Sequence, residues 1–117
     1  YIRSLLKRLT GLGAKRAALT GIGFRPDEIG FYMYDSTTDT YSHYYNEKLP
    51  VAYHGTGDVF ASAVVGANMR GKSIEESLKI AVDFTLEAMR KTMADPNSRF
   101  YGVNFEEALP YYIELLK

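Results

Sequence analysis

The 117-residue sequence contains no cysteine and no excess of charge of either sign, and each absence excludes classes of protein. Without cysteine the chain can form no disulfide, no zinc–thiolate site and no thiol nucleophile. Its 14 basic and 14 acidic residues cancel, whereas a surface for nucleic acid or an anionic membrane would need a basic excess. We therefore expect neither of these partners, and a cytoplasmic location agrees with the lack of cysteine.

Long apolar segments are missing as well. No run approaches the roughly 20 residues that span a bilayer. Residues 1–9 carry charges throughout, unlike a secretory signal peptide. The sequence also lacks an initiator methionine and begins as though within a helix, so we expect it to be a piece of a longer chain.

The first elements are predicted from the spacing of apolar residues. They recur at helical spacing over residues 2–9, and glycines follow, which predicts a helix. Residues 16–20 read Arg-Ala-Ala-Leu-Thr, a short run without clear alternation. This pattern predicts a buried strand of the kind found in parallel sheets, broken at Gly21.

Two aromatic segments, residues 29–35 and 40–46, flank a polar turn at residues 36–39 and predict an antiparallel hairpin. Five of the ten tyrosines of the chain lie in it, namely Tyr32, Tyr34, Tyr41, Tyr44 and Tyr45. They would form either a lid over a ligand or a half-buried sheet face. The sheet face is favoured, because aromatic residues are common in strands.

A helix predicted over residues 57–70, ended by Gly71, is apolar almost all the way round, and such helices are normally buried on several sides. The order of helices and strands indicates an α/β layer structure. Three strands cannot cover this helix together with the others. We expect the remaining surface to be buried by a missing part of the chain or by another subunit, which makes the protein a candidate homo-oligomer.

Capping patterns predict the last two helices. Ser73 and Glu76 form a capping box that starts a helix ending near residue 93. Asn104 precedes a final helix over residues 105–116 in the same way.

Residues 54–62 read His-Gly-Thr-Gly-Asp-Val-Phe-Ala-Ser and place a glycine turn before the apolar helix. Unpaired amides and the positive end of a helix dipole favour a phosphate there. Gly55 and Gly57, on either side of Thr56, let the backbone fold into a nest of donors. Asp58 follows in the first turn, where an acid commonly stabilises only its own helix. The alternative is that Asp58 acts beside a phosphate that comes and goes.

A second glycine turn strengthens the catalytic interpretation. Thr20 and Gly21 follow the predicted strand, and ligands of open α/β sheets bind at the carboxyl ends of strands. In a phosphoryl transfer, the amide nest would stabilise charge on the group in flight. Asp58 would accept the proton of the attacking hydroxyl.

The stretch Gly-Thr-Gly-Asp-Val-Phe-Ala-Ser over residues 55–62 resembles the signature of ribokinase-like (PfkB) kinases, within the pyridoxal kinase group. Residues 49–54 resemble that group's adenine-side loop, and residues 18–21 resemble its strand and nucleotide-phosphate turn. The resemblance covers essentially the whole chain. It implies that residues 1–117 form the nucleotide-side, C-terminal part of a three-layer α/β/α sandwich whose N-terminal, substrate-side part is absent.

The resemblance also implies an activity: ATP-dependent, magnesium-requiring phosphorylation of the hydroxymethyl group of a B6 vitamer, which is pyridoxal, pyridoxamine or pyridoxine. Asp58 would be the catalytic base, and Gly55, Thr56 and Gly57 would form the anion hole. The residues implied to contact the nucleotide are Thr20, Gly21, Val51, His54, Gly55, Thr56 and Gly57. No metal ligand is assigned, and we expect the isolated piece to be inactive.

Alternatives remain within and outside this superfamily. A kinase of hydroxymethylpyrimidine (phosphate) or of a sugar shares the architecture, although hydroxymethylpyrimidine kinases often carry cysteine where this chain has Asp58. The string from Asn104 to Glu107 imitates the family's Asn-x-x-Glu magnesium motif, but it lies in the wrong order along the chain and fits a helix cap better. The remaining alternative is a non-catalytic nucleotide-binding or oligomerisation module.

Overall fold

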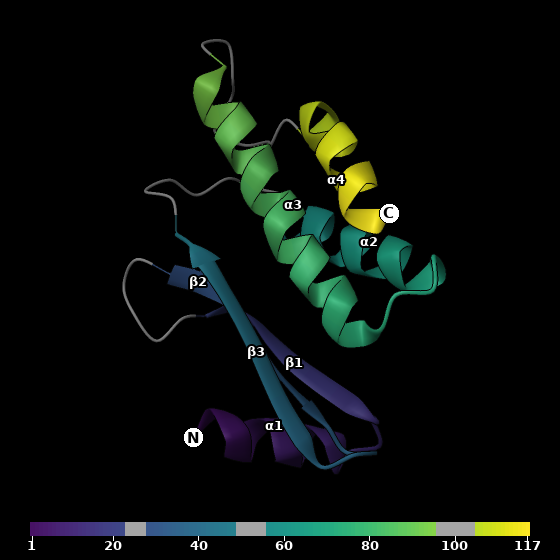
Figure 1. Cartoon of the computed structure of the whole chain (residues 1–117). Coiled ribbons are helices and arrows are strands. Elements are labelled where there is room, and N and C mark those ends of the chain that lie inside the picture. The colour runs from purple at the N-terminus through teal and green to yellow at the C-terminus, as the bar shows by residue number, and fades with distance from the viewer. Residues whose placement is uncertain (23–27, 49–55, 96–104) are drawn as a thin grey trace. The chain divides into compact units, whose positions relative to one another are not determined.

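The computed structural model describes residues 1–22, 28–48, 56–95 and 105–117. Their elements are, in chain order, α1 (Ile2–Thr10), β1 (Arg16–Ile22), β2 (Glu28–Asp35), β3 (Thr40–Glu47), α2 (Thr56–Met69), α3 (Ile74–Ala94), the 3-10 helix η1 (Phe105–Ala108) and α4 (Leu109–Leu116). The chain divides into two compact units, Tyr1–Lys48 and Leu49–Lys117 (Figure 1). The first holds a three-stranded sheet and the second holds helices, which confirms the predicted α/β class.

The sheet of the first unit has the order β1-β2-β3, and both pairs of neighbours are antiparallel. The predicted hairpin is confirmed, since β2 and β3 pair in register across the turn, with Tyr34 opposite Tyr41 and Tyr32 opposite His43. The rings of Tyr34 and Tyr41 lie 4.6 Å apart between centroids, a distance typical of aromatic cross-strand pairs.

Helix α1 covers the tyrosine-bearing face of this sheet. Leu6 is fully buried in a cluster with Tyr32 and Tyr34, which are 5% and 4% exposed. Arg3 donates from Nε to the Tyr32 hydroxyl at 2.8 Å, and its guanidinium lies 4.8 Å from the centroid of the Tyr41 ring. Tyr32, Tyr34 and Tyr41 therefore form a packed sheet face, in agreement with the favoured interpretation.

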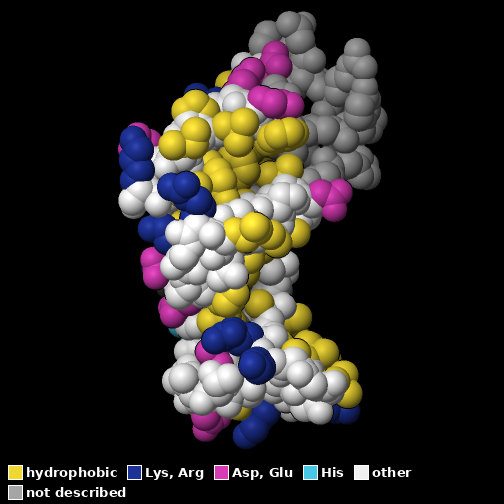
Figure 2. Space-filling model, turned by 90° about the vertical axis from the view of Figure 1, so that its right-hand side faces the viewer, with side chains coloured by type: hydrophobic (Ala, Val, Ile, Leu, Met, Phe, Trp, Pro, Cys, Tyr) yellow, Lys and Arg dark blue, Asp and Glu magenta, His cyan; other side chains and the backbone are white. Residues whose placement is uncertain are grey.

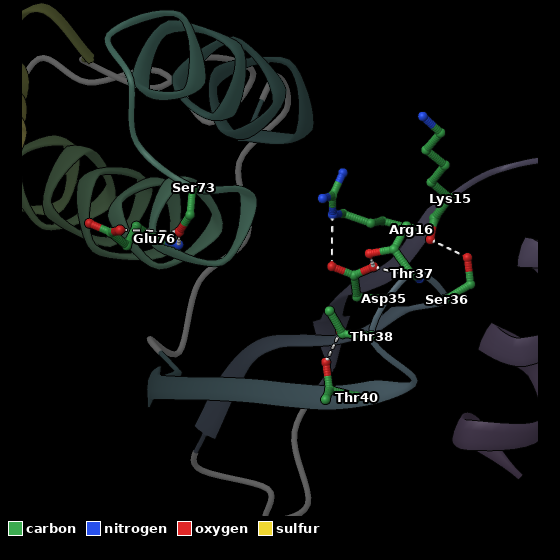
Figure 3. Close-up of polar contacts among 9 residues, drawn as sticks. All are labelled: Lys15, Arg16, Asp35, Ser36, Thr37, Thr38, Thr40, Ser73 and Glu76. Carbon is green, nitrogen blue, oxygen red and sulfur yellow. Dashed lines mark hydrogen bonds and ion pairs between the residues drawn. The ribbon is translucent and has the colours of Figure 1, made fainter.

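The turn of the hairpin is closed by polar contacts (Figure 3). The Asp35 carboxylate accepts hydrogen bonds from both the backbone N–H and the hydroxyl of Thr37, and it pairs with Arg16 Nε at 3.0 Å. The hydrogen bond from the Thr37 hydroxyl, helped by Arg16, lowers the pKa of Asp35. Ser36 donates to the Lys15 carbonyl at 2.7 Å, which joins the turn to the start of β1.

Strand β1 differs from its prediction in extent and in burial. It does not break at Gly21 but continues to Ile22, because Gly21 adopts φ +72° and forms a bulge that shifts the register between Thr20 and Ile22. Ala18 and Thr20 are exposed, whereas Ala17 and Leu19 pack against the α1 cluster. The partner described for β1 is antiparallel, so a parallel neighbour would have to pair with its other edge.

In the second unit, α2 packs against α3, and α4 lies alongside them (Figure 1). The core comprises Ala63, Ala81, Phe84, Ala88 and Ala108, with Val59, Phe60, Val64, Tyr112 and Leu115 packed against it. The alanines let the helix backbones approach closely, and Phe84 and Tyr112 fill the space between them, 4.8 Å apart between ring centroids.

Helix α2 begins and ends one residue earlier than predicted, within the usual uncertainty of helix ends. Only Ala63 and Ala67 are buried in it, whereas Val65 is 58% and Met69 is 82% exposed. Figure 2 shows apolar side chains gathered on one face of the helical unit. Apolar side chains of α2 are therefore exposed in the described residues. The expectation that a missing part of the chain or another subunit buries them stays a prediction.

Helix α3 starts at the predicted cap. The Ser73 hydroxyl oxygen accepts from the Glu76 backbone N–H at 3.1 Å, and the hydroxyl donates to the Glu76 carboxylate at 3.2 Å (Figure 3). The helix then runs to Ala94. In the part of the chain that the structure describes, no helix combines the length and the apolarity that crossing a membrane requires.

The final helix is divided in two, unlike its prediction. A short 3-10 helix, η1, precedes α4, and Pro110 lies in the first turn of α4. Proline is tolerated there, but inside one continuous helix it would lose the hydrogen bond to Glu106 and clash with that carbonyl. The predicted cap Asn104 lies outside the described residues.

Two serines one turn apart provide a stability test. Ser73→Ala removes the cap of α3 and should lower the free energy of unfolding by about 1 kcal/mol. Ser77→Ala removes a fully buried hydroxyl that has no hydrogen-bond partner among the described residues, so it should leave stability unchanged or raise it. Urea unfolding of the two variants measures both, and equal losses would contradict this account of the helix.

A glycine in the sheet provides the second test. A Cβ added at Gly30 would overlap the backbone carbonyl of Tyr44 on β3, so Gly30→Ala should lower the free energy of unfolding by about 3 kcal/mol. Gly57→Ala is the control, because no described atom lies within 4 Å of the Cβ that it adds. An unchanged urea midpoint for Gly30→Ala would show that the strands are not this close.

Candidate functional site

The first turn of α2 brings three predicted site residues together: Thr56, Gly57 and Asp58. Gly57 and Asp58 are exposed, and Thr56 is half-buried. The first turn of a helix presents backbone N–H groups that the helix itself does not use, and the helix dipole adds positive potential. The turn is therefore a place where an anion can be held by main-chain donors.

Gly57 is the most informative residue of this turn. Its φ is not in the left-handed region, and no described atom lies within 4 Å of the Cβ that another residue would carry. A glycine within a helix costs about 0.5–1 kcal/mol relative to alanine. Neither the backbone nor the packing of the described chain accounts for it. A ligand that approaches the backbone closely would account for it.

The side chain of Asp58, in the same turn, is exposed. Within the described residues its carboxylate makes no hydrogen bond or ion pair. A carboxylate in a first turn stabilises its helix by about 0.3–1 kcal/mol. The exposed carboxylate of Asp58 can therefore stabilise its own helix, and it is also accessible to the hydroxyl group of a bound substrate.

The start of α2 is held in place by the core behind it. Val59 and Phe60, the two residues after Asp58, pack against the cluster that contains Ala63 and Phe84. The open first turn is thus joined directly to a packed segment. Such support keeps the main-chain donors in one arrangement, which is what electrostatic stabilisation of a reacting group requires.

Thr20 and Gly21 form the second predicted phosphate turn and lie at the bulge near the end of β1. Both are exposed, and no described atom lies within 4 Å of a Cβ added at Gly21. They belong to the first unit, whereas Thr56, Gly57 and Asp58 belong to the second. Val51, His54 and Gly55 lie outside the described residues.

Metal ligands were not predicted from the sequence. The stretches that the structure describes contain no group of three or more His, Cys, Asp or Glu side chains that could hold a metal ion. In the string that imitates a magnesium motif, Glu106 and Glu107 are exposed in η1, and Asn104 lies outside the described residues.

The sequence did not indicate the contact that α4 makes with α2. The Tyr112 hydroxyl donates to the Ala63 carbonyl at 2.8 Å, directly beside Gly66. Gly66 was the signal in the sequence that could have indicated this contact, because an isolated glycine inside a helical pattern often marks a close approach of another segment. Which side chain would fill the space above Gly66 could not be read from the sequence.

Comparison with known proteins gives the family. Residues 2–103 match the family model described as phosphomethylpyrimidine kinase. No curated protein sequence matches the chain.

Solved structures give the fold. A candidate phosphomethylpyrimidine kinase from Bacteroides thetaiotaomicron is 26% identical with a TM-score of 0.86, over 94% of this chain and 38% of its own. Pyridoxal kinase from Lactobacillus plantarum is 24% identical with a TM-score of 0.85, over 98% of this chain and 42% of its own. Plasmodium falciparum PdxK is 14% identical with a TM-score of 0.74, over 95% of this chain and 38% of its own.

The chain therefore spans about two fifths of the length of the structures it matches. The resemblance drawn from the glycine turn is confirmed by a match that covers most of the chain. This chain belongs to the phosphomethylpyrimidine kinase family, within the ribokinase-like group that includes the pyridoxal kinases.

Proposed function

We propose that residues 1–117 are the nucleotide-side, C-terminal part of a kinase that transfers a phosphoryl group from ATP to the hydroxymethyl group of a B6 vitamer. The observation that carries the proposal is the open first turn of α2, where the unhindered backbone of Gly57 adjoins the exposed carboxylate of Asp58. The family match supports a kinase. The B. thetaiotaomicron protein was crystallised with pyridoxal, which supports the choice of acceptor.

The proposed role of the first turn is to stabilise the group in transfer. Main-chain N–H groups at Thr56 and Gly57, together with Gly55, would donate to the oxygens of the moving phosphoryl. Gly57 leaves space for those oxygens to approach the backbone. Because the transition state of phosphoryl transfer is loose, positioning and charge stabilisation supply most of the catalysis.

Asp58 would act as the base. Its exposed carboxylate belongs to the same turn as the donors, so it would be within reach of an acceptor hydroxyl that approaches this turn. In a loose transition state the hydroxyl need not lose its proton early, so a weak base is sufficient.

ATP is the proposed phosphoryl donor. Plasmodium falciparum PdxK was crystallised with AMP-PNP, and Leishmania donovani pyridoxal kinase with ADP. Thr20 and Gly21 at the β1 bulge would contact the nucleotide phosphates, and Val51 and His54 would lie beside the nucleotide. Mg²⁺ would balance the charge of ATP.

The exposed apolar surface of α2 supports the proposal that this chain requires a partner. Val65 and Met69 would be covered by the remainder of the kinase, its N-terminal part, with a second copy of the chain as the alternative. We expect the isolated 117 residues not to complete the reaction.

Asp58→Asn, made in a protein with the complete kinase fold, should lower kcat for pyridoxal by about 100-fold or more, the usual contribution of a positioned base. Its Kd for ATP should change little, because the substitution keeps the shape of the side chain. Coupled-enzyme kinetics and calorimetry measure the two quantities. Near-normal turnover would remove Asp58 from the mechanism.

Gly57→Ala tests the donor role separately. The added methyl group has space in the protein, so the urea midpoint should be equal or higher. Alanine keeps the backbone N–H, but its methyl group would hold the phosphoryl oxygens away from that donor, so kcat should fall by about 100-fold, as much as for loss of an oxyanion donor. Normal turnover with a raised midpoint would show that Gly57 faces no reacting group. ATP binding without turnover in the unmutated protein would instead favour the non-catalytic binding module.

Hydroxymethylpyrimidine is the second candidate acceptor, because the matched family model is described as phosphomethylpyrimidine kinase. Competition between pyridoxal and hydroxymethylpyrimidine as acceptors decides between them, read as the ratio of kcat/KM values. We expect the ratio to favour pyridoxal, and a ratio favouring the pyrimidine would keep the kinase and change the acceptor.

A further inference from the structure

A side chain from the last helix contacts the backbone of α2 in its middle. Tyr112 of α4 donates its hydroxyl to the Ala63 carbonyl at 2.8 Å, although the two residues are 49 positions apart in the sequence. Ala63 follows Asp58 by five residues, which is about 7.5 Å along the helix axis. The contact is therefore less than two turns away from the open first turn.

Gly66 provides the space for this contact. A Cβ added at Gly66 would lie 2.6 Å from the Tyr112 hydroxyl oxygen but 3.7 Å from its Cζ atom. The first distance is a clash, and the second is an ordinary van der Waals contact. A side chain at position 66 would therefore require the Tyr112 hydroxyl or α2 to shift.

The surroundings of Tyr112 hold its ring in place. Phe84 of α3 lies against it, and Leu115 joins the same cluster. Burial raises the pKa of Tyr112, and the Ala67 backbone amide opposes this with a smaller lowering. The hydroxyl therefore lies beside the Ala63 carbonyl and the Ala67 amide, which are the i and i+4 groups of one helical turn.

We infer that Tyr112 is a positioning residue: it fixes the placement of α2, and through it the placement of the Gly57 amide and the Asp58 carboxylate. The inference rests on the proposed kinase function. A helix is stiff along its axis, so a displacement at Ala63 moves the first turn as well. Misplacement of reacting groups by about 1 Å can cost 100-fold in rate.

The test uses four forms of a protein with the complete kinase fold: unmutated, Tyr112→Phe, Gly66→Ala and the double variant. Gly66→Ala forces the hydroxyl away from Ala63 or moves α2, whereas Tyr112→Phe removes the clashing oxygen and leaves the ring. Each form is measured for its thermal midpoint, its kcat and its KM for ATP.

Gly66→Ala alone should lower the thermal midpoint and lower kcat by about tenfold or more, with KM for ATP within about twofold. In the Tyr112→Phe background the same substitution should leave the midpoint unchanged or raise it, because alanine is the better helix former. The double variant should recover the kcat of Tyr112→Phe alone. The effect of Gly66→Ala on the thermal midpoint thus changes sign between the two backgrounds, which is expected only if Gly66 and Tyr112 are in contact.

Additive effects in the double variant would overturn the inference, and so would a parallel change in kcat and KM for ATP, which indicates general loss of structure. Tyr111→Phe is the control. It removes the hydroxyl of the exposed neighbouring tyrosine and should leave the thermal midpoint, kcat and KM for ATP unchanged. If the unmutated protein phosphorylates no acceptor, the proposed function fails and takes the inference with it. If that protein is active and the effects of Tyr112→Phe and Gly66→Ala add in the double variant, only the inference about Tyr112 fails.

Discussion

Helix α2 must be packed against the core through Ala63 and its neighbours while its first turn remains exposed, and the rest of the helical unit is arranged around this constraint. Its small side chains let α3 and η1 approach, since Ala63 meets Ala81 and Ala108 in one buried cluster. The first N–H groups of a helix have no carbonyl of a preceding turn to bond to, and in α2 the first turn holds Gly57, whose backbone is exposed. Rigid support behind free donors is the arrangement that binding a phosphate group requires.

Three glycines show how differently the same residue is used in this chain. Gly30 is required because a strand backbone passes close to it, and Gly66 because the Tyr112 hydroxyl occupies the space beside it. Gly57 has open space and an ordinary backbone conformation, so nothing in the described chain requires it. A glycine that the protein does not need for its own packing is informative about what lies outside the protein.

The exposed apolar surface of α2 and the partial match to known kinases both bear on the proposal that this chain is part of a larger domain. The chain spans about two fifths of the structures it resembles, and its apolar helix keeps Val65 and Met69 exposed. A helix that is apolar all round normally lies inside a larger domain. Both observations agree with the proposal that this chain contributes one side of a kinase.

Short-range signals in the sequence determined the elements of this protein. The capping pattern at Ser73 and the hairpin turn after Asp35 each involve residues only a few positions apart, and both were found where predicted. The helix that contains Asp58 begins at Thr56, one residue earlier than predicted. Such signals act through backbone geometry and hydrogen bonds within one turn, so they can be read without knowing the fold. The predicted site residues that share one turn, from Thr56 to Asp58, were placed together for the same reason.

Only the tertiary structure decided how distant residues meet. It showed that β1 continues through a bulge at Gly21, that Pro110 divides the last helix, and that Tyr112 lies on Ala63 beside Gly66. A glycine in a sequence shows that space is needed but not what fills it, because the neighbour comes from a segment far along the chain. The sequence therefore determined the chemistry of the first turn of α2, while packing between helices determined what holds that turn in place.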